Sequence, residues 1–349
     1  MTGVAATTRA TEIVLPGAVA PDGLQVRVRD LPAPARGQVV LRMEATGVSF
    51  AEQQMRLGKY YDQPPFPFVP GYDVVGTVVA TGPGVDGVFP GARYAAVTKI
   101  GGWASHLVLD AADLVAVPPG VDPEAAETVL VNGVTAWQML HRTARVAKGG
   151  TVVVLGANGG VGSTLVQLAR HAGIKVIGTA SARHHDAVLR LGATPVDYRD
   201  PALYDRIRAL APNGVDAVFD HVGGPGLKQS WALLRRGGTL VNYGSASQKG
   251  ENGLGSMIAL FGRLYAWNLL PNGRSATFYN LWAGKRNLPA FRARMSEDLT
   301  KLLRLVADGV LAPQIGGRFP LARAGEALAL AESRTVLGKV VIVGQEDQP

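Results

Sequence analysis

Cysteine is absent from all 349 residues of the chain. Its absence excludes disulfide bonds, cysteine-ligated zinc, iron–sulfur clusters and thiol nucleophiles, and it fits a reducing compartment. Long apolar runs are scarce as well: no uncharged stretch approaches the roughly 20 residues that span a bilayer, and the N-terminus lacks the apolar core of a signal peptide. We therefore expect a cytoplasmic protein without integral membrane association. The longest apolar stretch, 254–270, is interrupted by Gly255, Gly262 and Arg263, and it predicts a buried or pocket-lining helix.

Charged residues make up only 18% of the chain, against 47% hydrophobic residues, a balance typical of a compact globular protein. The length favours two domains. Most of the net charge of +8 lies in residues 263–323, which contain ten Lys and Arg but only three Asp and Glu. Because no nucleic-acid-binding motif accompanies these charges, we expect no nucleic acid partner. A solvated helical face is the first interpretation, and attraction for a polyanionic cofactor or substrate is the alternative.

The apolar pattern changes near residue 123. Before it, short runs such as EIVL, LQVRV and GYDVVGTVVATG alternate with turns, which is typical of a β-rich barrel or sandwich. After it, strands that are apolar on both faces alternate with helices, which predicts a parallel sheet covered on both sides. The expected strands are 151–155, 175–179, 196–198, 217–220 and 239–243, and the expected helices include 162–172 and 183–191. A last apolar run, 339–343, is expected to rejoin the N-terminal β domain.

The strongest local signal is a glycine-rich loop between an apolar strand and an amphipathic helix. The loop consists of Gly156, Ala157, Asn158, Gly159, Gly160, Val161 and Gly162. Small residues let the backbone approach a pyrophosphate, whose charge meets free N–H groups and the positive end of the helix. The strand–turn–helix context therefore predicts a dinucleotide site. A tight turn without a ligand is the alternative.

The end of the second strand bears on the choice of cofactor. An NAD site places Asp or Glu there to bind the ribose 2′-hydroxyl, and this chain has none before Asp186. Ser181 and Arg183 instead offer a hydroxyl and a guanidinium group, which suit a 2′-phosphate. The sequence therefore favours NADPH over NADH, with Arg183 as an ordinary surface residue as the alternative.

Together these residues resemble the medium-chain dehydrogenase/reductase superfamily, in its quinone oxidoreductase (zeta-crystallin-like) branch. The matching motifs follow one another along nearly the whole chain, at 47–52, 56–60, 70–76, 132–137, 191–193, 196–198, 220–224 and 338–340. The resemblance implies an α/β fold, with a Rossmann-type doubly wound parallel sheet inserted in a GroES-like β-rich domain. The GroES-like domain is expected over 1–125 and 276–349, and the Rossmann NADPH-binding domain over 126–275. We also expect a homodimer.

The same resemblance implies a set of site residues. Tyr60 is expected to border the nicotinamide, Thr135 to lie near it, and Tyr198 to approach the adenosine phosphate. The turns after the later strands are expected to complete the dinucleotide cradle. The remaining expected members of the site are Ser49, Val222, Tyr243, Gly244, Ser245, Phe278, Tyr279, Asn280 and Lys339.

The chain departs from the zinc alcohol dehydrogenases of this superfamily. Those enzymes carry a cysteine where Ser49 stands and a His-Glu pair where Tyr72 and Asp73 stand. The six histidines show no grouping typical of metal ligands, so we expect no metal. Without a metal Lewis acid, a hydride from NADPH still reaches an electron-poor substrate. We therefore expect reduction of a small molecule, either a quinone or an α,β-unsaturated carbonyl (enone or enoyl) compound.

Two questions stay open at this point. Tyr60 is the candidate catalytic residue, either as the proton donor or as a stacking wall, with water as the other possible donor. The alternative to an enzyme is a non-catalytic NADPH-binding or membrane-peripheral protein that retains the reductase fold, because fold alone does not dictate function.

Overall fold

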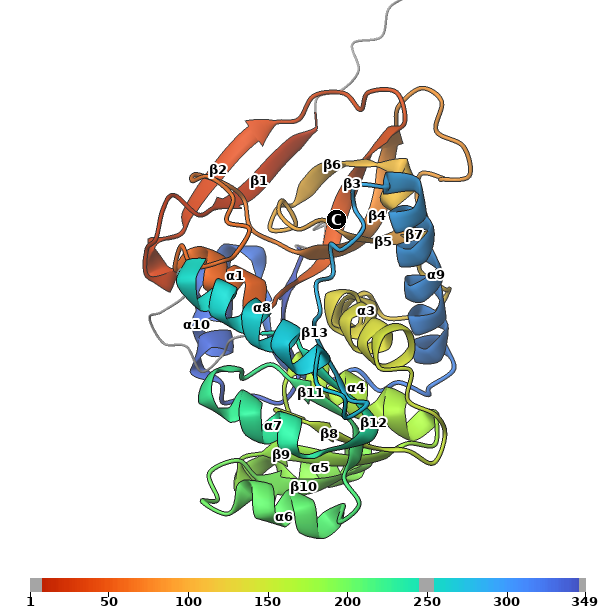
Figure 1. The fold of residues 1–349 in the computed structure, drawn as a ribbon. Helices are drawn as coiled ribbons and strands as arrows, with labels where there is room; N and C mark the ends of the chain where they lie inside the picture. Colours follow the sequence, from red (N-terminus) through yellow and green to blue (C-terminus); the bar gives the residue numbers. More distant parts are fainter. Residues whose placement is uncertain (1–7, 245–253, 345–349) are drawn as a thin grey trace, which may run out of the picture. The chain divides into compact units, whose positions relative to one another are not determined.

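The computed structural model describes residues 8–244 and 254–344. These residues form two compact units. Figure 1 shows the ribbon, with colours that follow the sequence. The first unit contains the chain up to Val134 and again from Gly284, and the second is Thr135–Ala283. The boundary falls within α3 (Val131–Trp137).

In its described part, the first unit is built on a seven-stranded sheet with the order β14-β15-β3-β4-β5-β7, and β6 pairs with β3. The strands are β3 (Gln38–Val48), β4 (Asp73–Thr81), β5 (Arg93–Val97), β6 (His106–Asp110), β7 (Val115–Ala116), β14 (Ile315–Pro320) and β15 (Lys339–Val343). The long strand β3 pairs antiparallel with β15 near its end and with β6 near its start. The prediction that 339–343 rejoins the N-terminal sheet is confirmed.

Most side chains of β3, β4, β5 and β15 are buried. Val39, Leu41 and Met43 of β3 point into a core that also contains Trp103. A separate antiparallel hairpin joins β1 (Arg9–Val14) and β2 (Gln25–Asp30). The helices of this unit are α1 (Phe50–Arg56), α2 (Pro123–Thr128), α9 (Leu288–Ala307) and α10 (Ala324–Ser333).

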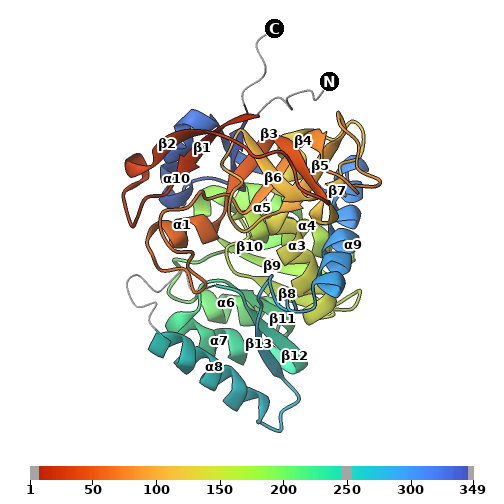
Figure 2. The same cartoon turned by 90° about the horizontal axis from the view of Figure 1, so that it is seen from above.

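The second unit contains a six-stranded parallel sheet in the order β10-β9-β8-β11-β12-β13. The strands are β8 (Thr151–Val154), β9 (Lys175–Ala180), β10 (Ala193–Asp197), β11 (Val215–Asp220), β12 (Leu234–Asn242) and β13 (Ser275–Phe278). In Figure 2, α4 (Gly160–His171) and α5 (His185–Leu191) lie on one face, and α6 (Leu203–Leu210) and α7 (Leu227–Ala232) lie on the other. This is the strand order of a Rossmann fold, and it confirms the predicted fold class.

Several predicted boundaries shift by a few residues. The helix expected from residue 162 begins at Gly160, because Gly159 is extended (φ −76°, ψ 172°) and the next glycine already adopts helical geometry. The helix expected over 183–191 is divided into a 3-10 turn, Ala182–His184, and α5. β12 begins at Leu234, earlier than predicted.

α8 (Leu254–Asn268) forms where a helix was expected, but it is not buried. Its residue Leu264 packs on the core of the second unit, whereas Ile258, Phe261 and Tyr265 are 62%, 48% and 68% exposed. The segment is mostly apolar, with Arg263 as its one charged residue, so composition predicted burial, whereas only one face packs on the core of the second unit. Of the two alternatives given for this helix, the buried one is therefore wrong, and the pocket-lining one stays a prediction. Among the described residues, no helix combines the length and apolar character that a membrane span requires.

Candidate functional site

The glycine-rich loop connects β8 to the N-terminus of α4. β8 and β11 are neighbours at the point where the strand order reverses, and the carboxyl ends of strands at such a point form a crevice. Gly159 is the N-cap of the 12-residue helix α4 and has no side chain to cap it. The N–H groups of the first turn lack acceptors within the helix, so this end is suited to an anion.

Two glycines make the loop tight. Gly156 has φ of 68°, and a Cβ there would lie 2.4 Å from the ring of His221. A Cβ on Gly162 would lie 2.2 Å from the carbonyl oxygen of Gly156. Thr179 of β9 fixes the loop from the side, since its hydroxyl accepts a 3.0 Å hydrogen bond from the Gly156 N–H. The loop therefore leaves no room for side chains at these two positions.

The turn after β11 lies against this loop. Asp220 accepts 2.8 Å hydrogen bonds from the N–H groups of Val222 and Gly223, so the turn is fixed by a buried carboxylate. A ring nitrogen of His221 lies 3.0 Å from the carbonyl oxygen of Leu155, at the start of the glycine loop. Sequence reasoning missed both Thr179 and His221. Their only signal was a position directly at or after a strand end.

The other predicted residues of the second unit follow the ends of β12 and β13. The ring of Tyr243 lies 5.9 Å from that of His221, and burial raises the pKa of its hydroxyl, which therefore stays protonated. The N–H of Tyr279 donates to Asn242, and its hydroxyl donates to Gln138 at 2.9 Å. Phe278 ends β13, and Asn280, in the turn that follows, accepts a hydrogen bond from the Trp282 N–H. Thr135 is buried in α3, Gly244 follows β12, and Ser245 lies outside the described residues.

Ser181, Arg183 and Tyr198 gather at the carboxyl ends of β9 and β10. Ser181 is buried directly after β9, and the N–H of Tyr198 donates to the last carbonyl group of that strand. Arg183 is exposed and donates to a ring nitrogen of His184 at 3.2 Å. The guanidinium of Arg199 lies 5.3 Å from the centre of the Tyr198 ring. Sequence reasoning missed Arg199, although its place beside Tyr198 was a usable signal.

In the first unit, Ser49 caps α1 and is linked to Tyr72 through Glu52. The N–H of Ser49 donates to Glu52 at 2.9 Å, and its hydroxyl bonds the same carboxyl group, which completes a capping box. The other Glu52 oxygen accepts a 2.7 Å hydrogen bond from the N–H of Tyr72. Burial raises the pKa of Glu52 above its ordinary value, which favours the neutral acid.

The hydroxyl groups of Tyr60 and Tyr72 lie 2.7 Å apart, close enough for a hydrogen bond. Their rings meet edge to face, at an interplanar angle of 85°. Burial raises the pKa of Tyr60 far above its ordinary value. The Tyr60 hydroxyl therefore stays protonated.

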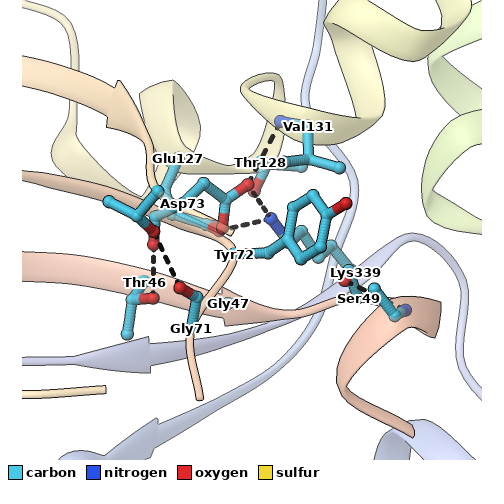
Figure 3. Close-up of polar contacts among 12 residues, drawn as sticks. Thr46, Gly47, Ser49, Gly71, Tyr72, Asp73, Glu127, Thr128, Val131 and Lys339 are labelled. Atoms are coloured by element: carbon cyan, nitrogen blue, oxygen red, sulfur yellow. Dashed lines mark hydrogen bonds and ion pairs between the residues drawn. The ribbon is translucent and has the colours of Figure 1, made fainter. Parts of the chain in front are cut away.

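Figure 3 shows the Lys339 ammonium group between two carboxyl groups, those of Asp73 and Glu127. Lys339 Nζ lies 2.7 Å from Asp73 Oδ2, and the N–H of Val131 donates to the same oxygen at 3.1 Å. All three charged side chains are buried. Burial disfavours a charged ammonium, but the two carboxyl groups raise the pKa of Lys339 above its ordinary value. These contacts favour a structural role for Lys339.

Comparisons with known proteins place this geometry in a family. The alcohol dehydrogenase GroES-like domain matches residues 35–119, and the family model described as zinc-binding dehydrogenase matches residues 191–342. A probable quinone oxidoreductase of Schizosaccharomyces pombe is 30% identical over 329 residues, which cover 93% of this chain and 94% of that protein. The chain belongs to the quinone oxidoreductase branch of the medium-chain dehydrogenase/reductase superfamily. The predicted resemblance is confirmed.

Two further relatives of this oxidoreductase are informative. The synaptic vesicle membrane protein VAT-1 homolog of Rattus norvegicus is 32% identical over 330 residues, covering 92% of this chain and 80% of that protein. A mycobacterial protein solved in complex with NADPH is 31% identical, covers 96% of this chain and 99% of its own, and superposes with a TM-score of 0.82.

The name of one matching family model raises the question of zinc, and the residues do not fit that ion. The Ser49 hydroxyl is bonded to Glu52, and the Tyr72 hydroxyl lies against Tyr60. Asp73 already holds the Lys339 ammonium, which would repel a cation. Within residues 8–244 and 254–344, no group of three His, Cys, Asp or Glu is placed to hold a metal ion.

Proposed function

We propose that this oxidoreductase binds NADPH and reduces a quinone or an α,β-unsaturated carbonyl compound. The observation that carries the proposal is the N-terminus of α4, where a helix capped only by Gly159 begins at the reversal point of a parallel sheet. The loop before this helix has no room for a side chain at Gly156 or Gly162, as a pyrophosphate cradle requires. The mycobacterial relative solved with NADPH supports this choice of cofactor.

The residues at the end of β9 support NADPH over NADH. Ser181 follows the strand where an NAD site would carry an acid, and Arg183 is exposed nearby. Arg199, which follows the end of the neighbouring strand β10, adds a second guanidinium group. We assign these three residues to the 2′-phosphate.

The nature of the substrate follows from the residues at the zinc positions. NADPH supplies the hydride when bound, and the substrate must accept it without polarisation by a metal ion. Quinones and enones are electron-poor enough, and their reduction leaves an oxygen anion that needs a proton. Tyr60 is our candidate donor. Activity should therefore be independent of zinc.

The test is NADPH oxidation with a panel of quinones, enals and enoyl thioesters, run in parallel with NADH. We expect turnover with at least one class and a preference for NADPH. NADPH binding in calorimetry without oxidation by any acceptor would contradict the proposal and favour a non-catalytic binding protein.

A further inference from the structure

One side of α8 presents a stripe of apolar side chains to solvent. Ile258, Phe261 and Tyr265 recur at the spacing of one helix face, and they are 62%, 48% and 68% exposed. Leu269 and Leu270, which are 66% and 46% exposed, follow directly after the helix. Together the five side chains of this α8 stripe expose on the order of 500 Å² of apolar surface, as much as the largest patches on typical monomers. A patch of this size is often a functional surface.

The other side of α8 is fixed to the second unit. Leu264 packs in the core of that unit, and the ring of Trp267 stacks on that of Trp231, with centres 5.0 Å apart and an interplanar angle of 9°. The Asn268 amide group donates to the carbonyl oxygen of Ala276 and accepts from its N–H, each at 2.8 Å. A rotation of the helix that buried the α8 stripe would break these contacts. The fold therefore holds the stripe outward.

Asn268 also closes part of the neighbouring sheet edge. β13 is the last strand of the parallel sheet, and the N–H of Tyr279, just after it, donates to Asn242 of β12. Because backbone groups alternate in direction along a strand, those of Ala276 point away from β12. Free N–H and C=O groups on an edge strand can pair with a further strand, but at Ala276 both groups bind Asn268. A partner at this part of the second unit therefore meets the side chains of α8 and does not extend the sheet.

The composition of the α8 stripe favours a second copy of the chain over a lipid surface as its partner. A helix that lies on a membrane carries a polar face rich in Lys and Arg, whereas Arg263 is the only charged residue of α8. Gly262 lies within the stripe, and a Cβ there would meet nothing within 4 Å, so the backbone of another helix can approach closely. Two such stripes would bury about 1,000 Å² in total, which is the area that a specific interface needs.

We propose that two copies of this chain associate through their α8 stripes, which pack on each other across a two-fold axis. A two-fold interface pairs one surface patch with the same patch on the second copy. The stripe suits this arrangement because its members carry no charge that would meet a like charge on the partner. The inference goes beyond the proposed function, since no residue of the stripe is assigned to the dinucleotide site.

The experiment measures the mass of the full-length protein by sedimentation equilibrium over a range of concentrations. It compares the wild type with an acidic variant, Ile258→Glu/Tyr265→Glu, and a basic variant, Ile258→Lys/Tyr265→Lys. The control is Leu189→Glu, because Leu189 is a 60% exposed apolar residue on α5. We expect the wild type and the control to have twice the mass of one chain at micromolar concentrations. Each charged variant should associate with itself at least about 10²-fold more weakly, because like charges would meet in a desolvated contact. Circular dichroism checks that each variant is folded.

A mixture of the two charged variants identifies the partner. The acidic and the basic copy should associate with each other at least about tenfold more tightly than either does with itself, because only a partner with the same stripe places opposite charges together. A monomeric wild type, a charged variant that still dimerises, or a mixture that stays monomeric would overturn the proposal. Vesicles of phosphatidylcholine and phosphatidylserine test the other partner. If they bind the wild type but not the charged variants, while the wild type stays monomeric, the stripe is a lipid-binding surface and the proposal is wrong.

Discussion

Lys339 Nζ lies 2.7 Å from Asp73 Oδ2, although the two residues are 266 positions apart in the chain. The same ammonium group reaches Glu127, so β15, β4 and α2 meet at one buried cluster. One positive charge faces two carboxyl groups. Burial raises the pKa of Glu127 well above its ordinary value, and the Lys339 ammonium only partly offsets this. Burial thus favours the neutral acid form of Glu127.

Removing the ammonium group should destabilise the first unit. Lys339→Met leaves Asp73 charged, buried and without its counter-ion, which costs about 3–5 kcal/mol in comparable cases. The measurement is the free energy of unfolding in denaturant, with Lys301→Met as the control for loss of an exposed ion pair. Equal stability of the two variants would mean that the buried pair contributes little.

Glu127 should also make stability depend on pH. Its pKa in the folded protein lies above the ordinary value of 4.5, so between these values the folded state binds more protons than the unfolded state. The contribution of Glu127 is fully present below pH 4.5 and is lost as pH rises through the folded-state pKa. As pH rises from 4.5 through the folded-state pKa of Glu127, the free energy of unfolding should fall less in Glu127→Gln than in the wild type. If the free energy of unfolding depended on pH in the same way in both proteins, Glu127 would already be ionised in the folded state.

The sequence allowed a good prediction of the second unit because its signals are local. The strand, glycine loop and helix around Gly160 follow one another without interruption, and each carries its own periodicity. The cluster around Lys339 was not predictable in the same way, because its members come from positions 73, 127 and 339 and no local pattern connects them. The composition of α8 gave a wrong prediction. Its residues are mostly apolar, which predicted burial, but only one face of the helix packs on the second unit and the rest is exposed.

Arg183→Ala should weaken the binding of NADPH but not of NADH. The loss of a hydrogen bond to a charged group costs about 1.5–3 kcal/mol. NADH has no 2′-phosphate, so its binding does not include this hydrogen bond. Calorimetry with both cofactors measures the difference, and Arg190→Ala, on α5, serves as the control. Equal losses for both cofactors would remove the basis for assigning Arg183 to the phosphate.

Prolonged treatment with a strong chelator should leave NADPH oxidation unchanged. The physical reason is that Ser49 and Tyr72 are engaged with Glu52 and Tyr60, and that Asp73 holds an ammonium group. Elemental analysis of the purified protein should find far less than one zinc per chain. Stoichiometric zinc whose removal abolishes turnover would contradict this expectation.

Gly162→Ala tests whether the glycine loop binds the dinucleotide. The added Cβ would lie 2.2 Å from the Gly156 carbonyl oxygen and 2.9 Å from the Cα of Ala157, so the backbone of the loop must move. NADPH affinity should fall by about tenfold or more, which is at least about 1.4 kcal/mol, while the loss in stability stays within the ordinary range of about 0.5–3 kcal/mol. Gly262→Ala is the matched control: a Cβ there meets nothing within 4 Å, and alanine in a helix should stabilise by up to about 1 kcal/mol. Near-normal NADPH affinity in folded Gly162→Ala would mean that the loop is only a turn, and the proposed reductase would lose its main physical support.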